Sequence, residues 1–515
     1  MTAPRATAAA ADFDSMSASR RRAMPWILLY VAVLLLPLGL AALKAPAHAD
    51  SFVKQIALGL GLFGLMIIAT NFILAARYQW LVGPFGLDTV MLFHRRMALT
   101  GFAAILLHIT LMTILKIHLL TQWRQPLRIQ LGRTAILLLT AQIIVSVYRS
   151  GMGVKFEKWK SWHRVLAVGI LAVAFSHGLL SSGRFAPWPL RLVVMPVALI
   201  ALWSIIWSRI IRPRRLREFP YAVREVRKIG RAVWEIKLQS VRASRSFEYR
   251  PGQFAFFHFH RSAPEASSEE HVWTIASSPS ESDGLMLAIK ELGDFTRTMD
   301  RTRVGDEVTV HGPFGRFSHR LYKDMDDIVF IAAGIGITPF RSMIRWMTDR
   351  GETRKVQLLY GNRSAAEIAF LDELTDCEKR GGGKLRVTHV LSQPDEHWSG
   401  EKGRIDIDVV RRHCGGELGG KSFWICGPGP FATVLIESLR RAGVPPGKIH
   451  SEAFCLLHAP VQADGRGRSL KALSAAICLA AFVTVLMFAL IRTDFLSAYR
   501  GSADRGAQPR AVRVP

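Results

Sequence analysis

The chain has 515 residues, half of them hydrophobic, and a formal net charge of +27. This length predicts two or three domains. The arginines collect at the ends of hydrophobic segments and not among aromatic residues, so the charge indicates membrane topology and argues against nucleic-acid binding. The five cysteines lack CxxC or CxxxxCxxC spacing, which argues against a structural zinc or a plant-type iron–sulfur cluster.

The N-terminal part predicts a tail followed by a membrane helix. Residues 1–23 are rich in Ala and Ser and end in basic residues, which is typical of a disordered cytoplasmic tail. Residues 24–43 are apolar and long enough to cross a bilayer. The segment Ala47–Ala49 resembles a signal-peptidase site, so removal of the first helix stays an alternative.

Five more hydrophobic segments complete a predicted transmembrane domain over 24–212. They are 52–76, 94–115, 131–148, 162–180 and 189–211. Alternate connections hold 17 and 8 Lys and Arg residues, and the richer set includes the N-terminal tail. By the positive-inside rule this set faces the cytoplasm, which predicts a multi-pass protein of the inner (plasma) membrane.

Two of these segments carry histidines at the same interval. His94 and His108 lie on one, His163 and His177 on the other, and both intervals are fourteen residues. This interval is about 21 Å along a helix and falls about 40° short of four full turns, so each helix presents two imidazoles on one face. A single histidine in such a helix is usually a hydrogen-bonded contact, but two matched pairs predict two stacked haem sites. The inner pair is His94 with His163, and the outer pair is His108 with His177.

After residue 212 the pattern changes to two soluble folds. Residues 217–322 contain short alternating strands, which predict an antiparallel β-barrel. Residues 325–455 alternate strand and helix, which predicts an α/β domain with a parallel sheet. The strands expected in the first fold are 221–229, 232–242, 253–260, 271–277, 285–290 and 307–311. A linker, 456–471, then leads to a further apolar segment of transmembrane length, 472–491, and a tail, 492–515.

A glycine turn opens the first helix of the α/β domain. Gly334 and Gly336 allow a phosphate to approach the backbone, and Thr338 and Pro339 suit the cap and the first turn of the helix. The turn lacks the third glycine of the dinucleotide fingerprint and has Pro339 in its place. Its position after a strand favours nucleotide binding.

Several further motifs follow one another in the soluble part. They are Arg250–Phe254, His271–Pro279, Gly293–Thr296 and Gly312–Gly315, then Gly334–Pro339, Tyr360–Arg363 and Cys426–Pro428. In this order they resemble the flavin motifs and then the nicotinamide nucleotide motifs of the ferric reductase and NADPH oxidase superfamily, whose cytosolic half is similar to ferredoxin–NADP reductase. The resemblance covers about residues 50 to 455. Val272 and Trp273 replace the usual Pro-Phe of the second flavin motif.

The resemblance implies cofactors and site residues. FAD would be bound by His271–Ser277, with Thr274 near the isoalloxazine and His271 toward the phosphates. Phe454 would cover the flavin ring and yield to nicotinamide, and Cys426 would lie near the carbon that takes part in hydride transfer. The implied cofactor-binding residues are His271, Trp273, Thr274, Ile275, Ser277, Gly293, Thr296, Gly334, Gly336, Thr338, Pro339, Arg363, Gly427 and Pro428.

The predicted activity is transmembrane electron transfer from NADPH or NADH through FAD and two b-type haems. The acceptor on the outer face is a ferric chelate or dioxygen, because a ferric-chelate reductase and a superoxide-producing oxidase share this relay. A membrane haem subunit that donates electrons to a periplasmic protein is an alternative, and a non-catalytic scaffold is another. Arg363 suits a 2′-phosphate but also occurs where NADH is used, so the nucleotide stays open.

Overall fold

The computed structural model describes residues 16–43, 52–115, 125–149, 151–181, 188–242, 247–262, 269–281, 284–322 and 327–452. The predicted linker, the segment 472–491 and Phe454 lie outside these residues. Two compact units make up the chain. One consists mainly of helices over 23–81 and 90–209, and the other contains 82–89 and the two sheets after residue 210.

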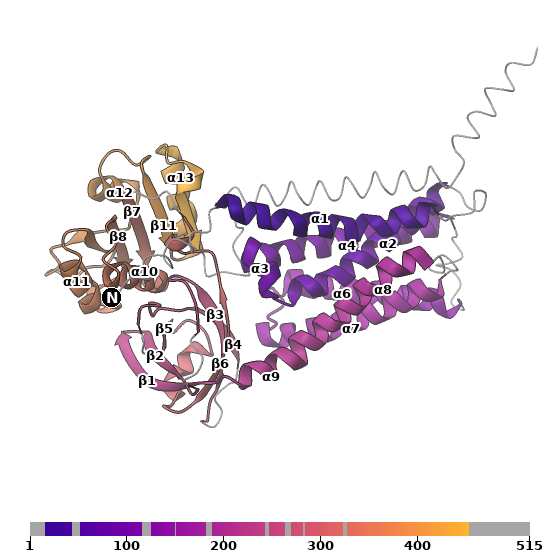
Figure 1. Ribbon diagram of the computed structural model, residues 1–515, viewed down its shortest axis with the longest axis horizontal. Helices are drawn as coiled ribbons and strands as arrows, with labels where there is room; N and C mark the ends of the chain where they lie inside the picture. Colours follow the sequence, from indigo (N-terminus) through magenta and orange to yellow (C-terminus); the bar gives the residue numbers. More distant parts are fainter. Residues whose placement is uncertain are drawn as a thin grey trace, which may run out of the picture. The chain divides into compact units, whose positions relative to one another are not determined.

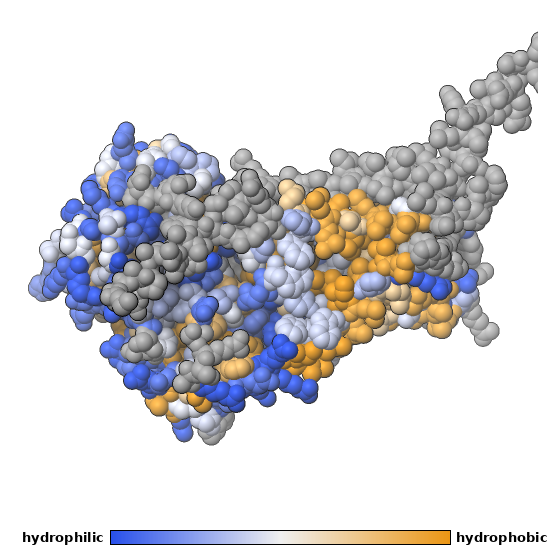
Figure 2. Space-filling view, in the orientation of Figure 1, coloured by the Kyte–Doolittle hydropathy of each residue, from blue (hydrophilic) through white to orange (hydrophobic). Residues whose placement is uncertain are grey.

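The helical unit contains the long helices of the first half of the chain (Figure 1). Within the described residues, six helical stretches are long and apolar enough to cross a membrane, which agrees with the six spans predicted over 24–212. Leucine and isoleucine side chains such as Leu137 and Ile114 are 70% exposed, and Figure 2 shows hydrophobic residues gathered on this unit. The elements are α1 (Met16–Leu43), α2 (Phe52–Ala75), α3 (Gln79–Phe85), α4 (Leu87–Leu115), α6 (Leu127–Tyr148), α7 (Phe156–Leu180) and α8 (Trp188–Ile206), then a π-helical turn (Trp207–Ile211) and α9 (Arg212–Arg217).

Small residues bring α2 and α4 close together. A Cβ on Gly64 would lie 2.5 Å from Ile105 Cγ1, and one on Gly101 would lie 2.8 Å from Ile67 Cγ2. Helices in membranes associate by such packing, because lipid removes the hydrophobic driving force between them. The two glycines therefore fix the spacing of α2 and the first histidine helix, α4.

The first soluble sheet is antiparallel and has the strand order β4-β3-β6-β1-β2-β5. All six predicted strands are present, but the expected closed β-barrel is wrong. The edge strands β4 and β5 share no ladder within the described residues; a single backbone bond, Ala276 N to Met286 O at 2.8 Å, joins them just beyond β4. The next amide on β5, Met286 N, donates to the Ser277 hydroxyl at 3.0 Å, which takes the place of a backbone acceptor. The strands are β1 (Tyr221–Gly230), β2 (Val233–Ser240), β3 (Phe254–His260), β4 (Glu270–Thr274), β5 (Leu285–Lys290) and β6 (Glu307–Phe314).

The second sheet is parallel, as predicted, with the strand order β10-β9-β8-β7-β11-β12. Two helix starts are set by the residue before them: α11 follows Phe370, whose φ is 62°, and α12 begins after Asp406, whose side chain accepts hydrogen bonds from Asp408 N and Val409 N. The strands are β7 (Asp327–Ala333), β8 (Lys355–Asn362), β9 (Leu385–Leu391), β10 (Glu401–Lys402), β11 (Lys421–Cys426) and β12 (Ile449–Glu452), and the helices are α10 (Thr338–Asp349), α11 (Leu371–Arg380), α12 (Ile407–Cys414) and α13 (Gly429–Arg441).

The two sheets share one core and one buried ion-pair cluster. Arg341 on α10 is 3% exposed and binds Glu281 with both terminal nitrogens, at 2.8 and 3.0 Å. Its Nε and Nη2 bind Glu373 on α11 at 3.0 and 2.7 Å, and its Nη1 also donates to Ala276 O at 2.8 Å. Burial acts to lower the pKa of this guanidinium, but Glu281 and Glu373 outweigh it and raise the pKa above the ordinary value. Arg341 thus joins the flavin motif, at Ala276, to the α/β domain.

Replacement of Arg341 by Met is expected to lower the free energy of unfolding of this unit by about 3 kcal/mol, because it leaves two partly buried carboxylates without their counter-charge. Denaturant unfolding of the full chain, followed by tryptophan fluorescence, measures the change. Arg441→Met is the control, since Arg441 is 78% exposed and pairs with Glu437 at the surface; its cost should stay below about 1 kcal/mol. Equal effects of the two substitutions would contradict this role of Arg341.

Candidate cofactor sites

The first flavin motif is a tight turn held by one glutamine. Gln253 Oε1 accepts a hydrogen bond from Arg250 N at 2.8 Å, and Gln253 Nε2 donates to Gly315 O at 3.0 Å. Gly252 has φ of 89°, and a Cβ there would clash with Phe317 O. The side chain of Gln253 therefore connects two motifs that are sixty residues apart in the sequence, Arg250–Phe254 and Gly312–Gly315.

Thr274 closes β4 with a buried hydroxyl. It pairs with Phe254 of β3, so the two side chains lie on the same face of the sheet. Thr274 is 3% exposed, and within the described part of the chain its Oγ1 has no hydrogen-bond partner. A buried hydroxyl without a partner is costly. It fits a ligand with hydrogen-bonding atoms at its edge, as the isoalloxazine has.

His271 and Trp273 lie on the other face of β4. Their rings stack with centroids 5.2 Å apart, and the His271 ring is 4.0 Å from Phe295. His271 Nε2 also lies 3.1 Å from Glu269 Oε2. Because Phe295 belongs to the motif Gly293–Thr296, the fold brings His271 to the predicted diphosphate loop. In this loop the Thr296 hydroxyl accepts hydrogen bonds from Leu292 N and Gly293 N, both at 2.9 Å.

Ile275 and Ser277 of the second flavin motif make contacts within the protein. The side chain of Ile275 is fully buried in the sheet core, so it does not reach a ligand. Its backbone amide donates to Gln253 O at 3.0 Å. The Ser277 hydroxyl lies 2.9 Å from the Tyr249 hydroxyl in addition to its bond from Met286 N. Burial raises the pKa of Tyr249, so the phenol keeps its proton.

Sequence reasoning missed Arg261 beside the diphosphate loop. Its Cζ lies 4.1 Å from the centroid of the Phe295 ring, and its Nη1 donates to Thr298 O at 3.0 Å and Thr298 Oγ1 at 2.9 Å. Burial lowers the pKa of this guanidinium, while Asp306 and Asp300 act to raise it. Among 67 basic residues, nothing in the sequence distinguishes this arginine from the others.

The nucleotide motifs converge at the carboxyl ends of β7 and β11, which are parallel neighbours. A Cβ on Gly336 would clash with Cys426 O and lie 2.9 Å from Gly427 N. A Cβ on Gly427 would lie 2.9 Å from Ala333 Cβ and 3.0 Å from the Phe431 ring. Glycine is therefore needed at both positions for the backbones to approach, and Pro428 follows directly at the start of α13.

Thr338 differs from its prediction as a helix cap. Its hydroxyl donates to Ile335 O at 3.1 Å, and no side chain caps the first turn of α10, where Pro339 lies as expected. Gly334, with φ of 55°, opens the preceding turn. The amide groups at the start of α10 thus meet no side-chain acceptor, which suits an anionic ligand.

Cys426 is fully buried at the end of β11. Burial, and then the charge of Glu452, raise the pKa of its thiol well above the ordinary value, so it stays protonated. Glu452 Oε1 lies 3.5 Å from the position of a Cβ on Gly315. The described chain therefore ends beside the flavin turn, two residues before Phe454.

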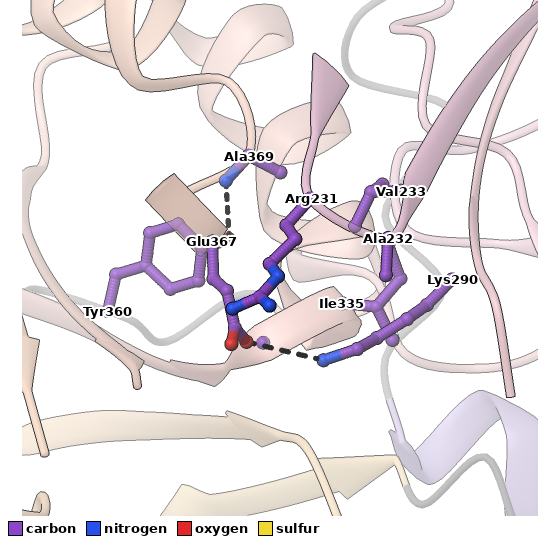
Figure 3. Close-up of a pocket in the computed structure, with 9 residues that line it drawn as sticks. Arg231, Ala232, Val233, Lys290, Ile335, Tyr360, Glu367 and Ala369 are labelled. Atoms are coloured by element: carbon purple, nitrogen blue, oxygen red, sulfur yellow. Dashed lines mark hydrogen bonds and ion pairs between the residues drawn. The ribbon is translucent and has the colours of Figure 1, made fainter. Parts of the chain in front are cut away.

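Arg363 is exposed and pairs with Glu367, Nε to Oε1 at 3.0 Å. Glu367 Oε2 also lies 3.7 Å from Lys290 Nζ, which comes from the flavin-side sheet (Figure 3). Lys290 and Glu367, but not Arg363, line a small pocket between the two sheets. Its lining residues are Arg231, Ala232, Val233, Lys290, Gly334, Ile335, Tyr360, Glu367 and Ala369. Lys290 and Glu367 are further polar residues that sequence reasoning missed.

The four predicted haem ligands lie on α4 and α7. His94 is within electrostatic range of His163, and His108 of His177, which are the predicted pairs. His108 Nδ1 lies 2.6 Å from Ala57 O and His177 Nδ1 lies 2.6 Å from Arg128 O, while His163 Nδ1 lies 3.3 Å from Ser146 Oγ. Within the described ranges no group of three or more His, Cys, Asp or Glu could hold a metal ion; haem iron needs only two axial ligands.

Three family models match the chain. The ferric reductase-like transmembrane component matches residues 60–174, an FAD-binding domain matches 222–317, and an oxidoreductase NAD-binding domain matches 330–436. These domains define an oxidoreductase of the ferric reductase and NADPH oxidase-like superfamily, with FAD and NAD domains of the ferredoxin–NADP reductase type. The resemblance seen in the motifs is confirmed.

Two curated relatives are reductase components of monooxygenases. The chain is 30% identical over 235 residues to that of propane 2-monooxygenase from Mycolicibacterium goodii, which is 44% of this chain and 64% of the relative. It is 30% identical over 203 residues to that of phenol 2-monooxygenase from Pseudomonas sp. strain CF600, which is 39% of this chain and 56% of the relative. The chain thus spans less than two thirds of the length of each.

Solved structures with similarity include the cytochrome b5 reductase domain of Ulva prolifera nitrate reductase. The TM-score is 0.41 at 21% identity, over 45% of this chain and 96% of that domain. The flavohemoglobin of Malassezia yamatoensis has a TM-score of 0.43 at 18% identity, over 82% of this chain and 98% of its own.

Gly336→Ala is expected to reduce NAD(P)H oxidation with ferricyanide at least tenfold, because the new methyl group forces the turn away from Cys426 and Gly427. Flavin content should stay unchanged, since the flavin motifs are on the other sheet. Gly447→Ala, with no atom within 4 Å of its Cβ, is the matched control. Unchanged kinetics of the Gly336 variant would contradict this function of the turn.

Proposed function

We propose that this protein is a membrane flavocytochrome that transfers electrons from NAD(P)H on the cytoplasmic side to an acceptor on the outer face. The observation that carries the proposal is the set of two histidine pairs on α4 and α7, combined in one chain with FAD- and NAD-binding domains. The excess of Lys and Arg in alternate connections supports inner-membrane insertion with both reductase domains in the cytoplasm.

In the reductase unit, residues of this chain would bind the nucleotide and the flavin and orient them. The amide groups at the start of α10 and the glycines Gly334, Gly336 and Gly427 would receive the nucleotide, and Thr274 would hydrogen-bond the flavin. FAD supplies the step between a two-electron hydride donor and one-electron acceptors. Cys426 keeps its proton and contributes bulk beside the nicotinamide, and Phe454 would cover the flavin ring.

In the helical unit, the four histidines would hold two b-type haems, which supply one-electron carriers across the bilayer. A backbone carbonyl accepts but never donates a hydrogen bond, so His108 and His177 must carry their proton on Nδ1. The lone pair is then on Nε2, the nitrogen available to iron. This tautomer is the one that ligation of iron through Nε2 requires.

The choice of nucleotide depends on a shared carboxylate. Arg363 is the candidate for a 2′-phosphate, but Glu367 pairs with it and also lies near Lys290. An NADPH phosphate would have to compete with Glu367 for Arg363, whereas NADH would leave this ion pair in place. Arg363 could thus bind the 2′-phosphate of NADPH, or stay paired with Glu367 when NADH binds. We therefore propose NADPH or NADH as the donor.

The acceptor is proposed as a ferric chelate or dioxygen. A periplasmic protein that takes electrons from the haem subunit is the second candidate, and the similarity to reductase components of monooxygenases, which work beside partner proteins, favours keeping it. A non-catalytic scaffold would contain no haem.

His94→Leu and His177→Leu should each remove the absorbance of one haem, because each deletes one axial ligand of a different pair. Reduced-minus-oxidised spectra of the purified full chain measure this loss, with flavin content as the control for folding. The haem proposal fails if haem content is unchanged in both variants.

The purified protein, supplied with NADH or NADPH, should reduce an acceptor that meets only its outer face. Ferric-chelate reduction and cyanide-insensitive superoxide formation are compared in proteoliposomes with the nucleotide on one side and the chelate on the other. Reduction of neither acceptor, with haems that are still reduced by the nucleotide, would favour the protein acceptor.

A further inference from the structure

The two outer histidines lie against glycines on neighbouring helices. A Cβ on Gly61 of α2 would lie 3.0 Å from His108 Nδ1 and 3.1 Å from His108 Cε1. A Cβ on Gly132 of α6 would lie 2.9 Å from His177 Cε1 and 3.0 Å from His177 Nδ1. Both distances are shorter than ordinary van der Waals contact, so any other residue would push on the imidazole.

Each glycine comes four residues after the carbonyl that the same histidine meets. Ala57 O accepts from His108 Nδ1, and Arg128 O accepts from His177 Nδ1, both at 2.6 Å. In a helix the carbonyl of residue i points toward the amide of residue i+4, so the side chain of residue i+4 stands beside that carbonyl. Glycine at i+4 leaves the carbonyl open to a ring that approaches from the side.

The two sites repeat one arrangement on two helices. We propose that Ala57–Gly61 and Arg128–Gly132 are matched cradles that set the tautomer and ring orientation of the two axial ligands of the outer haem. The proposal rests on the proposed function, since it assumes haem at His108 and His177. In this view Gly61 and Gly132 are positioning residues: they touch the ligands and not the iron.

The inner histidine on α7, His163, is held differently from the two outer histidines. His163 Nδ1 meets a hydroxyl, Ser146 Oγ at 3.3 Å, and this hydroxyl already accepts from Trp159 Nε1 at 3.2 Å. A short bond to a carbonyl increases the basicity of a ligating imidazole more than a long bond to a hydroxyl. At the outer site, Ser181 Oγ also lies 3.2 Å from His177 Nδ1, but the carbonyl is closer.

The loss of one cradle has a defined consequence for the outer haem. A methyl group at residue 61 or 132 displaces the ring from its carbonyl, so the ligand becomes less basic and stabilises ferric iron less. The midpoint potential of that haem should therefore rise, and the inner haem should keep its own. If the ring moves further, the outer haem is lost and haem content falls by about half.

The experiment uses the purified full chain with Gly61→Ala and Gly132→Ala as separate variants. Gly39→Ala on α1 and Gly169→Ala on α7 are the controls, because no atom lies within 4 Å of the Cβ at either position. Haem content, the low-spin ferric EPR signals and a redox titration are measured, with flavin content and ferricyanide reduction as tests that the rest of the chain is folded.

The expected result is that both cradle variants change the EPR signal and raise the midpoint potential of one haem, or lose that haem alone, while both controls keep the wild-type values. The cradle proposal is overturned if both variants keep two haems with unchanged signals and potentials, or if Gly169→Ala alters the same haem to the same extent. A wild-type protein without haem would overturn the proposed function as well, so the two failures are distinguishable.

Discussion

The cost of placing polar side chains inside an apolar bundle is the constraint on which the helical unit depends. An imidazole at membrane depth needs a hydrogen-bond partner or a ligand for both nitrogens. For His108, His177 and His163 the chain meets this need at one nitrogen, with carbonyls of α2 and α6 at Ala57 and Arg128 and with the hydroxyl of Ser146. Helix packing follows from the same need, because the rings reach those carbonyls only where glycine brings the helices close.

The reductase unit meets a related constraint with charge and close backbone contact. Arg341 is buried between Glu281 and Glu373 and also bonds Ala276 O, so the flavin motif and helix α10 form one body. Gly336 and Gly427 let the ends of β7 and β11 approach at the nucleotide turn. These contacts hold the two sheets together around the flavin and nucleotide motifs. None of them requires a side chain to act as an acid or a base.

Patterns with a short period could be predicted from the sequence, and contacts between distant segments could not. The six spans and the six strands depend on local periodicity, and they were found. Whether the edge strands of the first sheet join depends on which group accepts a hydrogen bond from Met286 N. The hydroxyl of Ser277 accepts it, and a backbone carbonyl does not. Thr338 matched a capping pattern but donates to Ile335 O, a choice set by the turn before it. Arg261, Lys290 and Glu367 gain their roles only when separate strands meet.

The repeated carbonyl–glycine arrangement extends to further positions of the same helices. Ten residues after each glycine, α2 has Asn71 and α6 has Gln142, and each neighbouring histidine helix has the same fourteen-residue interval. Helix pairs α2–α4 and α6–α7 therefore share a layout at four positions, so the two outer histidines meet the same kind of hydrogen-bond partner from two different helices.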